Sequence, residues 1–207
     1  MKTVVIATGN AHKAEEFNRL AEAFSLSEVR FVSAKDALPD GMPRVVEDAG
    51  TFVGNARLKA RALRERVPAE FFVLADDSGL CVDALGGAPG VETAYYAGPS
   101  ATAAENRAKL LAALEGVPAE KRGAHFVCLL LLIAPDGSER VFEGKCEGVI
   151  TRAEAGTGGF GYDPVFAPHG FSATFAELGA EEKDRLSHRG NAFARLAAFF
   201  GAGTNAA

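Results

Sequence analysis

Tryptophan is absent from this sequence of 207 residues, and cysteine is scarce, with three copies. The cysteines are Cys81, Cys128 and Cys146; they form no CxxC pair, and their number is odd. Such a set disfavours a disulfide framework or a zinc site and indicates free thiols in a reducing compartment. Cys128 lies inside an apolar run, so we expect it to be packed in the core.

Long hydrophobic segments are also missing. The longest apolar run, 126–134, has nine residues, whereas a membrane-spanning helix needs about 20. The first residues, MKTVVIATGN, carry too short an apolar run for a signal peptide. We therefore expect a soluble, cytoplasmic protein with no membrane partner.

An excess of positive charge is the third missing feature. Lys and Arg together number 22 against 27 Asp and Glu, which gives a net charge of −5. Broad nucleic-acid binding requires a basic face, so the charge argues against a nucleic-acid partner. An anionic small molecule stays compatible if local Lys, Arg, backbone N–H groups or a metal ion offset the background field.

Hydrophobic periodicity predicts an α/β fold. Strands are expected over 2–7, 71–75, 124–134 and 139–150, and helices after Asn10, over 51–67 and 101–114, and after Ser187. Asn10 and Ser187 are candidate N-caps, whereas 33–50 and 86–100 are typical of loops. The turn sequence Pro-Asp-Gly-Ser at 135–138 predicts an antiparallel hairpin, and hence a mixed sheet. We expect one domain over 1–200 and a frayed tail over 201–207.

The first candidate motif is Thr8-Gly9-Asn10-Ala11-His12-Lys13, directly after the first predicted strand. A glycine turn that feeds a helix leaves backbone N–H groups free to bind an anion, and Lys13 would add a point charge for a phosphate. The alternative is a simple strand–helix connector with a solvated lysine. The motif is not a Walker A loop, which requires GxxxxGK[ST].

Acidic residues supply the second and third candidates. Asp76-Asp77-Ser78-Gly79 follows a predicted buried strand, where ligands gather in α/β sheets, and carboxylates are natural ligands of Mg²⁺. The alternative is a polar turn bonded to its own backbone. Glu47 precedes a predicted helix and is a candidate second metal ligand, while Asn55 and Lys59 share one face of that helix. Taken singly, such residues are usually surface residues.

Two further motifs lie nearer the C-terminus. The stretch GTGGFGYDP at 156–164 contains a formal GxGxxG, but it does not open a helix after a first strand, which excludes a dinucleotide-binding loop. A glycine loop that presents Phe160 or Tyr162 to a base fits better. Lys183, with His188 and Arg189 after Ser187, would contact a base or phosphate, or would form a capped basic helix start.

Taken together and in this order, the motifs resemble the inosine/xanthosine triphosphatase family. The matching stretches are ATGNAHKAEEF, E…TF..NA..KA, ADDSGLCVDALGGAPGVETA, EGVITR, GTGGFGYDPVF and EEKDRLSHRG, which run from residue 7 to residue 190. The resemblance implies an elongated, twisted mixed β-sheet with flanking helices in two lobes and a site in the cleft between them. It also implies a homodimer that hydrolyses ITP, XTP and their deoxy forms to the monophosphate and pyrophosphate, with Mg²⁺ as cofactor.

The resemblance also implies roles for the motif residues. Thr8, Gly9, Asn10, Ala11, His12 and Lys13 would hold the triphosphate, and Ser78 would contact the substrate. Asp77 would accept a proton from the attacking water and bind the metal together with Glu47, with Asn55 and Lys59 nearby. Phe160, Gly161, Tyr162, Asp163, Lys183, His188 and Arg189 would form the base pocket.

Two positions depart from the family pattern. Tyr95 stands where many bacterial members carry arginine, and Gly54 stands where glutamate is usual, so a third carboxylate has no counterpart there. Two alternatives stay open: a Mg²⁺ phosphohydrolase with another nucleotide preference, and a non-catalytic nucleotide-binding module. The joint presence of Glu47 and Asp77 disfavours the second.

Overall fold

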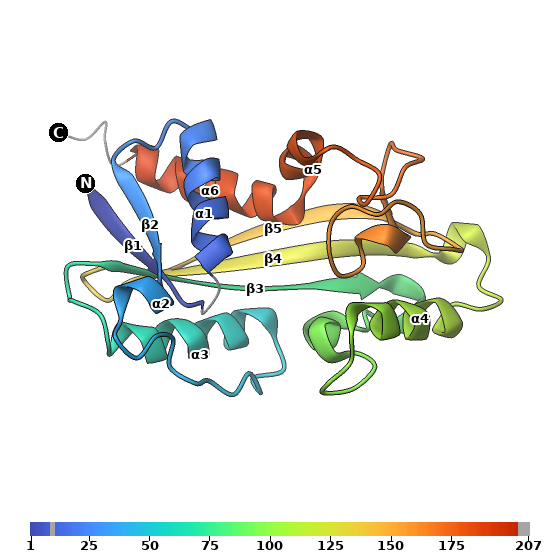
Figure 1. The fold of residues 1–207 in the computed structure, drawn as a ribbon, viewed down its shortest axis with the longest axis horizontal. Coiled ribbons are helices and arrows are strands. Elements are labelled where there is room, and N and C mark those ends of the chain that lie inside the picture. The colour runs from blue at the N-terminus through green and yellow to red at the C-terminus, as the bar shows by residue number, and fades with distance from the viewer. Residues whose placement is uncertain (9–10, 203–207) are drawn as a thin grey trace. The chain divides into compact units, whose positions relative to one another are not determined.

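The computed structural model describes residues 1–8 and 11–202 (Figure 1). The strands are β1 (Lys2–Ile6), β2 (Val29–Ser33), β3 (Phe72–Val82), β4 (Gly123–Ile133), β5 (Glu139–Ile150) and β6 (Phe166–Pro168). The helices are α1 (Ala11–Ala23), α2 (Ala34–Ala37), α3 (Phe52–Arg64), α4 (Ala103–Ala113), α5 (Ala180–Leu186) and α6 (His188–Ala202). Short 3₁₀ turns are η1 (Asp83–Leu85), η2 (Gly90–Tyr95), η3 (Ala119–Lys121) and η4 (Asp163–Val165). Within the described ranges, no helix combines the length and the apolar character that crossing a membrane requires.

The six strands form one mixed sheet in the order β2-β1-β3-β4-β5-β6. β1 runs parallel to both β2 and β3, and β6 runs antiparallel to β5. β4 and β5 are neighbours joined by a tight turn, in which the Ala134 amide donates to the Ser138 carbonyl at 2.9 Å. The predicted α/β class, the hairpin and the mixed sheet are therefore confirmed.

The chain divides into two compact units. The first unit contains residues 1–77, 129–143 and 192–207, and the second contains 78–128 and 144–191. β3, β4 and β5 each contribute residues to both units. Of the polar motifs, Lys13, Glu47 and Asp77 belong to the first unit, whereas the glycine loop and Lys183 belong to the second.

In the first unit, strand alternation sends side chains to two opposite faces of the sheet. Val5 and Val73 belong to a buried cluster with Ala56, Ala60 and Leu63 of α3. On the other face the rings of Phe17 in α1, Phe31 in β2 and Phe193 in α6 pack with centroids 5.5–5.6 Å apart. Figure 1 shows α3 on one side of these strands and α1 and α6 on the other. Each face of the sheet in this unit is therefore covered by helices.

The second unit has a core of its own. Leu80 and Val82 of β3 join Leu110 of α4, Leu114 directly after that helix, and a group of aromatic rings that includes Phe126 and Phe166. Cys128 of β4 is fully buried, as predicted, and all three cysteines are free. In this unit α4 therefore packs through its leucines against β3 and the aromatic rings.

Capping residues explain where several helices begin. The Thr51 hydroxyl accepts from the Gly54 amide at 3.1 Å at the start of α3. Thr102 and Glu105 form a reciprocal capping box at the start of α4. The predicted cap at Ser187 is confirmed, because its hydroxyl accepts from the Gly190 amide at 3.0 Å. Asn10, the other predicted cap, lies outside the described residues.

The structure corrects several predicted boundaries. The predicted strand ended at Ala75, but β3 continues through Asp76-Asp77-Ser78-Gly79, because neighbouring strands supply backbone partners that outweigh local turn preference. β2, α2 and α5 were not predicted, and α2 lies within the range 33–50 that was assigned to a loop. α6 includes Gly201 and Ala202 of the predicted tail, whereas 203–207 lie outside the described residues.

Candidate active site

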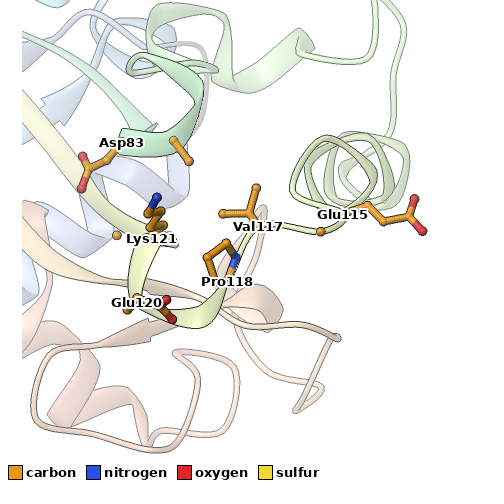
Figure 2. Close-up of a pocket in the computed structure, with 9 residues that line it drawn as sticks. Asp83, Glu115, Val117, Pro118, Glu120 and Lys121 are labelled. Carbon is orange, nitrogen blue, oxygen red and sulfur yellow. The ribbon is translucent and has the colours of Figure 1, made fainter.

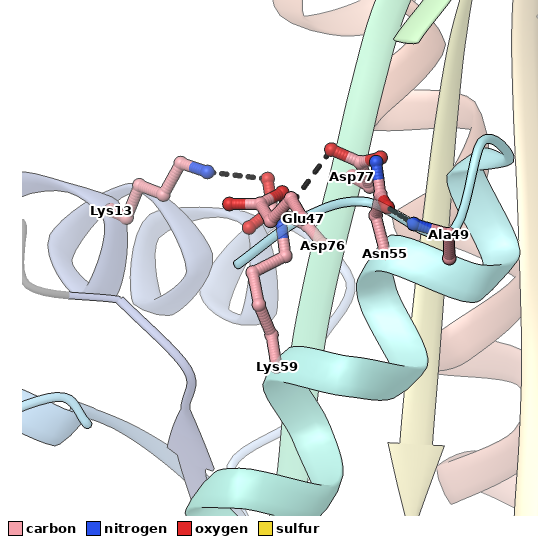
Figure 3. A network of polar contacts seen from close by, with 7 residues as sticks. All are labelled: Lys13, Glu47, Ala49, Asn55, Lys59, Asp76 and Asp77. Atoms are coloured by element: carbon pink, nitrogen blue, oxygen red, sulfur yellow. Dashed lines mark hydrogen bonds and ion pairs between the residues drawn. The ribbon is translucent and has the colours of Figure 1, made fainter. Parts of the chain in front are cut away.

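The two adjacent aspartates of β3 contact side chains of different helices (Figure 3). Successive residues of a strand point to opposite faces. Asp76 is 4% exposed and accepts from Lys13 Nζ of α1 at 2.5 Å. Asp77 instead faces α3, where its Oδ1 lies 3.4 Å from Lys59 Nζ. Each aspartate therefore has its own lysine.

Lys59 brings together two carboxylates that are far apart in the sequence. Its Nζ donates to Glu47 Oε2 at 2.7 Å and lies 3.4 Å from Asp77 Oδ1. Burial acts to lower the pKa of Lys59, but Asp77 and the hydrogen bond to Glu47 outweigh it, so the pKa is raised and the side chain stays charged. The structure thus places both predicted metal-binding carboxylates around a single cationic atom.

Asn55 fixes the loop that carries Glu47. Its side chain is buried in α3, and its Oδ1 accepts from the Ala49 amide at 3.1 Å. This bond holds the loop against the start of α3, next to Lys59 one turn further along the helix. Asn55 therefore ties the segment just after Glu47 to the helix that carries Lys59.

Gly54 makes that close approach possible. A Cβ at Gly54 would lie 2.5 Å from the Ala49 Cβ and 2.8 Å from Thr51 Oγ1. A glutamate, which is usual at this position in the family that the sequence resembles, therefore has no room here without a shift of the loop. The departure at Gly54 and the small Ala49 side chain fit each other.

We expect Gly54→Ala to lower the free energy of unfolding by about 1 kcal/mol. Overpacking costs roughly 1–3 kcal/mol, which exceeds the gain of up to about 1 kcal/mol from replacing a helical glycine. Urea denaturation measures the change. Ala49→Gly combined with Gly54→Ala should recover part of the loss, because the contact with Thr51 Oγ1 remains. A Gly54→Ala protein more stable than the parent would contradict the packing argument.

The environment of Asp77 suits an oxygen-bound cation. Burial raises the pKa of Asp77, Lys59 opposes this, and Glu47 adds to it, with a net upward shift. Its Oδ2 is buried and has no hydrogen-bond partner in the part of the chain that is described. Over the same residues, no group of three or more His, Cys, Asp or Glu side chains is arranged for a metal. Two carboxylates with the remaining ligands from water and phosphate fit Mg²⁺.

The second unit holds a compact polar group at the glycine loop. Asp163 is buried, and its Oδ2 accepts from the Phe160 amide at 2.6 Å and from Lys183 Nζ at 2.5 Å. Gly159 has φ +72°, and a Cβ there would overlap the Asp163 carboxylate at 2.1 Å. The loop therefore requires glycine at this position to wrap around Asp163.

Basic side chains surround the ring of Phe160. The ring is 64% exposed, and its centroid lies 4.7 Å from Lys183 Nζ and 5.9 Å from Arg189 Cζ. His188 is buried and stacks on Phe126 with centroids 4.8 Å apart. An exposed aromatic face bordered by cations suits a planar, electron-rich base.

Tyr162 has a different environment from Phe160. Its ring is buried in the core of the second unit, and its hydroxyl donates to the Thr93 carbonyl at 3.0 Å. Burial, with a contribution from Tyr96, raises the pKa of Tyr162 above the usual range. Of the two rings that the sequence offered for stacking, the structure therefore presents Phe160, and Tyr162 is a core residue.

A pocket of about 770 Å³ lies elsewhere in the second unit (Figure 2). Its lining residues are Asp83, Ala84, Glu115, Gly116, Val117, Pro118, Glu120, Lys121 and Gly123. Three carboxylates against one lysine disfavour a triphosphate. The lining contains none of the candidate site residues, so this pocket is not the candidate site.

The remaining predicted residues divide as follows. Thr8 lies two residues after the end of β1, and Ser78 is half-buried within β3. Gly9 and Asn10 lie outside the described residues, as do the side chains of Ala11 and His12 at the start of α1. Sequence reasoning missed Asp76 as the partner of Lys13; the signal was strand alternation, which becomes visible once β3 is known to continue through both aspartates.

The fold and the candidate site together define a class of protein. It is an α/β protein in which acidic and basic side chains gather in a way that suits a metal-bound phosphate. The chain belongs to the Ham1 family, whose sequence model matches residues 4–199. This confirms the resemblance described above.

Individual relatives agree with this assignment. A protein of Opitutus terrae named dITP/XTP pyrophosphatase is 57% identical over 195 residues, which cover 93% of this chain and 95% of that one. One of Streptomyces coelicolor with the same name is 48% identical, with coverage of 95% and 96%. The structure of the Staphylococcus aureus Ham1 protein is 36% identical, with a TM-score of 0.86 and coverage of 98% and 100%. That of a Mycobacterium abscessus nucleoside-triphosphatase / dITP/XTP pyrophosphatase is 44% identical, with a TM-score of 0.77 and coverage of 94% and 98%.

Proposed function

We propose that this protein hydrolyses ITP, dITP, XTP and dXTP to the nucleoside monophosphate and pyrophosphate, with Mg²⁺ as cofactor. In the cell this reaction would remove non-standard purine nucleotides before their incorporation into DNA and RNA. The observation that carries the proposal is the convergence of Glu47 and Asp77 on one cationic atom, Lys59 Nζ. The names of relatives at 57% and 48% identity support the substrate class.

Asp77 is the proposed proton acceptor. A water oxygen forms a bond to phosphorus, the bond to the bridging oxygen breaks, and pyrophosphate leaves with that oxygen. Asp77 takes the proton from the water as the general base. When bound at Glu47 and Asp77, Mg²⁺ would supply positive charge to the phosphate oxygens.

Lysines and backbone groups would bind the triphosphate. Lys13 lies in the first turn of α1, where the helix start favours an anion. Asp76 holds its ammonium at 2.5 Å and so keeps it oriented until phosphate competes for it. We assign Thr8, Gly9, Asn10, Ala11, His12 and Lys13 to the triphosphate, and Ser78 to a further substrate contact.

The second-unit group would select the base. Hypoxanthine and xanthine present a 6-oxo acceptor beside an N1–H donor, whereas adenine presents the opposite pair. Lys183 and Arg189 carry donors beside the exposed Phe160 ring. A fixed donor for O6 would leave adenine unmatched, at a cost of about 1–3 kcal/mol per buried group. The base pocket that we propose comprises Phe160, Gly161, Asp163, Lys183, His188 and Arg189; Tyr162, whose ring is buried in the core, is not part of it.

A pyrophosphate-release assay tests the proposal. ITP, XTP, GTP, ATP and a pyrimidine triphosphate are compared with Mg²⁺ present and after chelation by EDTA. We expect pyrophosphate release from ITP and XTP only when Mg²⁺ is present. A preference for a pyrimidine triphosphate, or release that persists in EDTA, would contradict it.

Phe160→Ala should raise KM for ITP by roughly 5- to 100-fold with kcat nearly unchanged, because base–aromatic stacking contributes about 1–3 kcal/mol. The ring is mostly exposed, so we expect little loss of stability. Steady-state kinetics measures the split, with Phe160→Tyr as the control that keeps an aromatic face. An unchanged KM would remove Phe160 from the base pocket.

The family resemblance also leads us to propose a homodimer. Sedimentation equilibrium of the purified protein measures its mass in solution, and a monomer across the micromolar range would contradict this part of the proposal.

A further inference from the structure

Arg107 of α4 connects a rigid helix to the glycine loop of the second unit. Its Nη1 donates to the Gly161 carbonyl at 2.8 Å, and its Nε lies 2.9 Å from Glu154 Oε1. The side chain is 15% exposed, so water competes weakly for these contacts. The guanidinium is a planar fork with several donors, which allows one side chain to hold two partners at once.

The loop requires such support because of its composition. Gly159 and Gly161 both have positive φ, at +72° and +59°. Glycine loses more conformational freedom on ordering than any other residue, so a loop of this kind is costly to hold in one shape. Asp163 fixes one side of it through the Phe160 amide. Arg107 bonds the carbonyl of the very next residue, Gly161.

α4 is a firm base for this contact. Its first turn is closed by the Thr102–Glu105 capping box. Leu110 and Leu114, at its far end, are fully buried in the core of the second unit. The position of Arg107 is thus set by a packed helix, and the Phe160–Gly161 segment takes its position from it.

We propose that Arg107 is a positioning residue for base recognition, which holds the glycine loop in the shape that presents Phe160 to the purine. The inference rests on the proposed function. Ordering the loop before binding lowers the entropy cost of binding, which appears as affinity. Arg107 contacts the loop and not the reacting phosphates, so its removal should weaken base binding and leave the chemical step intact.

Three variants test this role. Arg107→Met removes the donors and keeps an unbranched chain, and Arg107→Lys keeps the charge but loses the fork. Lys109→Met is the matched control: it removes one positive charge from the same helix, and Lys109 bonds the Tyr96 carbonyl instead of the loop. For each variant we measure kcat and KM for ITP, the inhibition constant of inorganic tripolyphosphate, which has no base, and the thermal midpoint.

We expect Arg107→Met to raise KM for ITP roughly tenfold, as for a lost hydrogen bond from a charged group. We also expect kcat within about twofold and an unchanged inhibition constant for tripolyphosphate, because a base-side defect spares phosphate affinity. The KM of Arg107→Lys for ITP should lie between those of Arg107→Met and the parent, and the KM of Lys109→Met should equal that of the parent.

Three results would overturn the inference. An unchanged KM for ITP would show that the loop holds its shape without Arg107. An equal loss of affinity for ITP and tripolyphosphate, or a fall in kcat with a lowered thermal midpoint, would indicate a general structural role. A parent protein that releases no pyrophosphate from ITP but hydrolyses another triphosphate would refute the proposed function itself, and is distinguished by the substrate panel.

Discussion

Asp77→Asn is expected to lower the rate of pyrophosphate release from ITP by about 10²–10⁴-fold, the contribution typical of a general base. Asn keeps the shape of the side chain but can neither accept the proton nor bind a cation as a carboxylate does. At saturating Mg²⁺, nucleotide affinity should be largely retained, because Lys13 and the base pocket are untouched. Single-turnover kinetics together with ITP binding by calorimetry separates the two quantities.

The stability of this variant provides an internal control. The folded-state pKa of Asp77 is raised, so the site favours the neutral form, and ionised Asp77 opposes folding at neutral pH. This unfavourable contribution begins to shrink as the pH falls through the folded-state pKa and is gone below the unfolded-state pKa. Asn is neutral at every pH, so the thermal midpoint at pH 7 should be equal to or above that of the parent. Near-normal turnover in Asp77→Asn would remove Asp77 as the proton acceptor.

Glu47→Gln should raise the Mg²⁺ concentration needed for half-maximal activity by roughly 10- to 100-fold, the range expected for loss of a charged partner. At saturating Mg²⁺ the rate should recover substantially, because Asp77 still accepts the proton. A titration of activity against free Mg²⁺ at fixed ITP measures the shift.

Asp48→Asn is the matched control for Glu47→Gln. Asp48 is the next residue of the same loop and is exposed. Its substitution removes the same unit of charge as Glu47→Gln. Its Mg²⁺ requirement should equal that of the parent. If both variants shift the requirement equally, the effect comes from the general charge of the loop, and Glu47 is not a specific metal ligand.

Local sequence patterns predicted the elements that carry strong local signals. The apolar runs on either side of Pro135-Asp136-Gly137-Ser138 gave a correct hairpin, and hydroxyl caps such as Ser187 marked the start of helices. β3 was predicted too short, because Asp76 to Gly79 has the composition of a turn. Its extended conformation comes from tertiary strand pairing, which local preference does not encode.

The candidate site was predictable as a set of residues, but not as a geometry. Resemblance selected Glu47, Asp77 and a nearby Lys59, and the structure adds that both carboxylates approach one atom, Lys59 Nζ. The resemblance did not predict that the two aspartates have different partners. Because successive residues of β3 point to opposite faces, Asp76 faces Lys13 and Asp77 faces Lys59. Arg107 carries no motif signal, because its role depends on a contact 54 residues away in the chain.

The two departures from the family pattern have different structural outcomes. Gly54 is explained by packing, since Ala49 occupies the space that a Cβ would need. Tyr95, which replaces the usual arginine, ends η2 with its ring 40% exposed. Nothing in the structure explains that replacement.

The most direct test is a crystal structure with Mn²⁺ in place of Mg²⁺ and a non-hydrolysable α,β-methylene analogue of ITP. Anomalous scattering locates the metal independently of any assumption about its ligands. We expect an ion with carboxylate oxygens of both Glu47 and Asp77 at about 2.1 Å, the distance typical of Mg²⁺, and a phosphate oxygen completing its shell. The account would be contradicted by an ion that binds the triphosphate while the carboxylate of Glu47 or Asp77 stays paired with Lys59 and does not contact the ion.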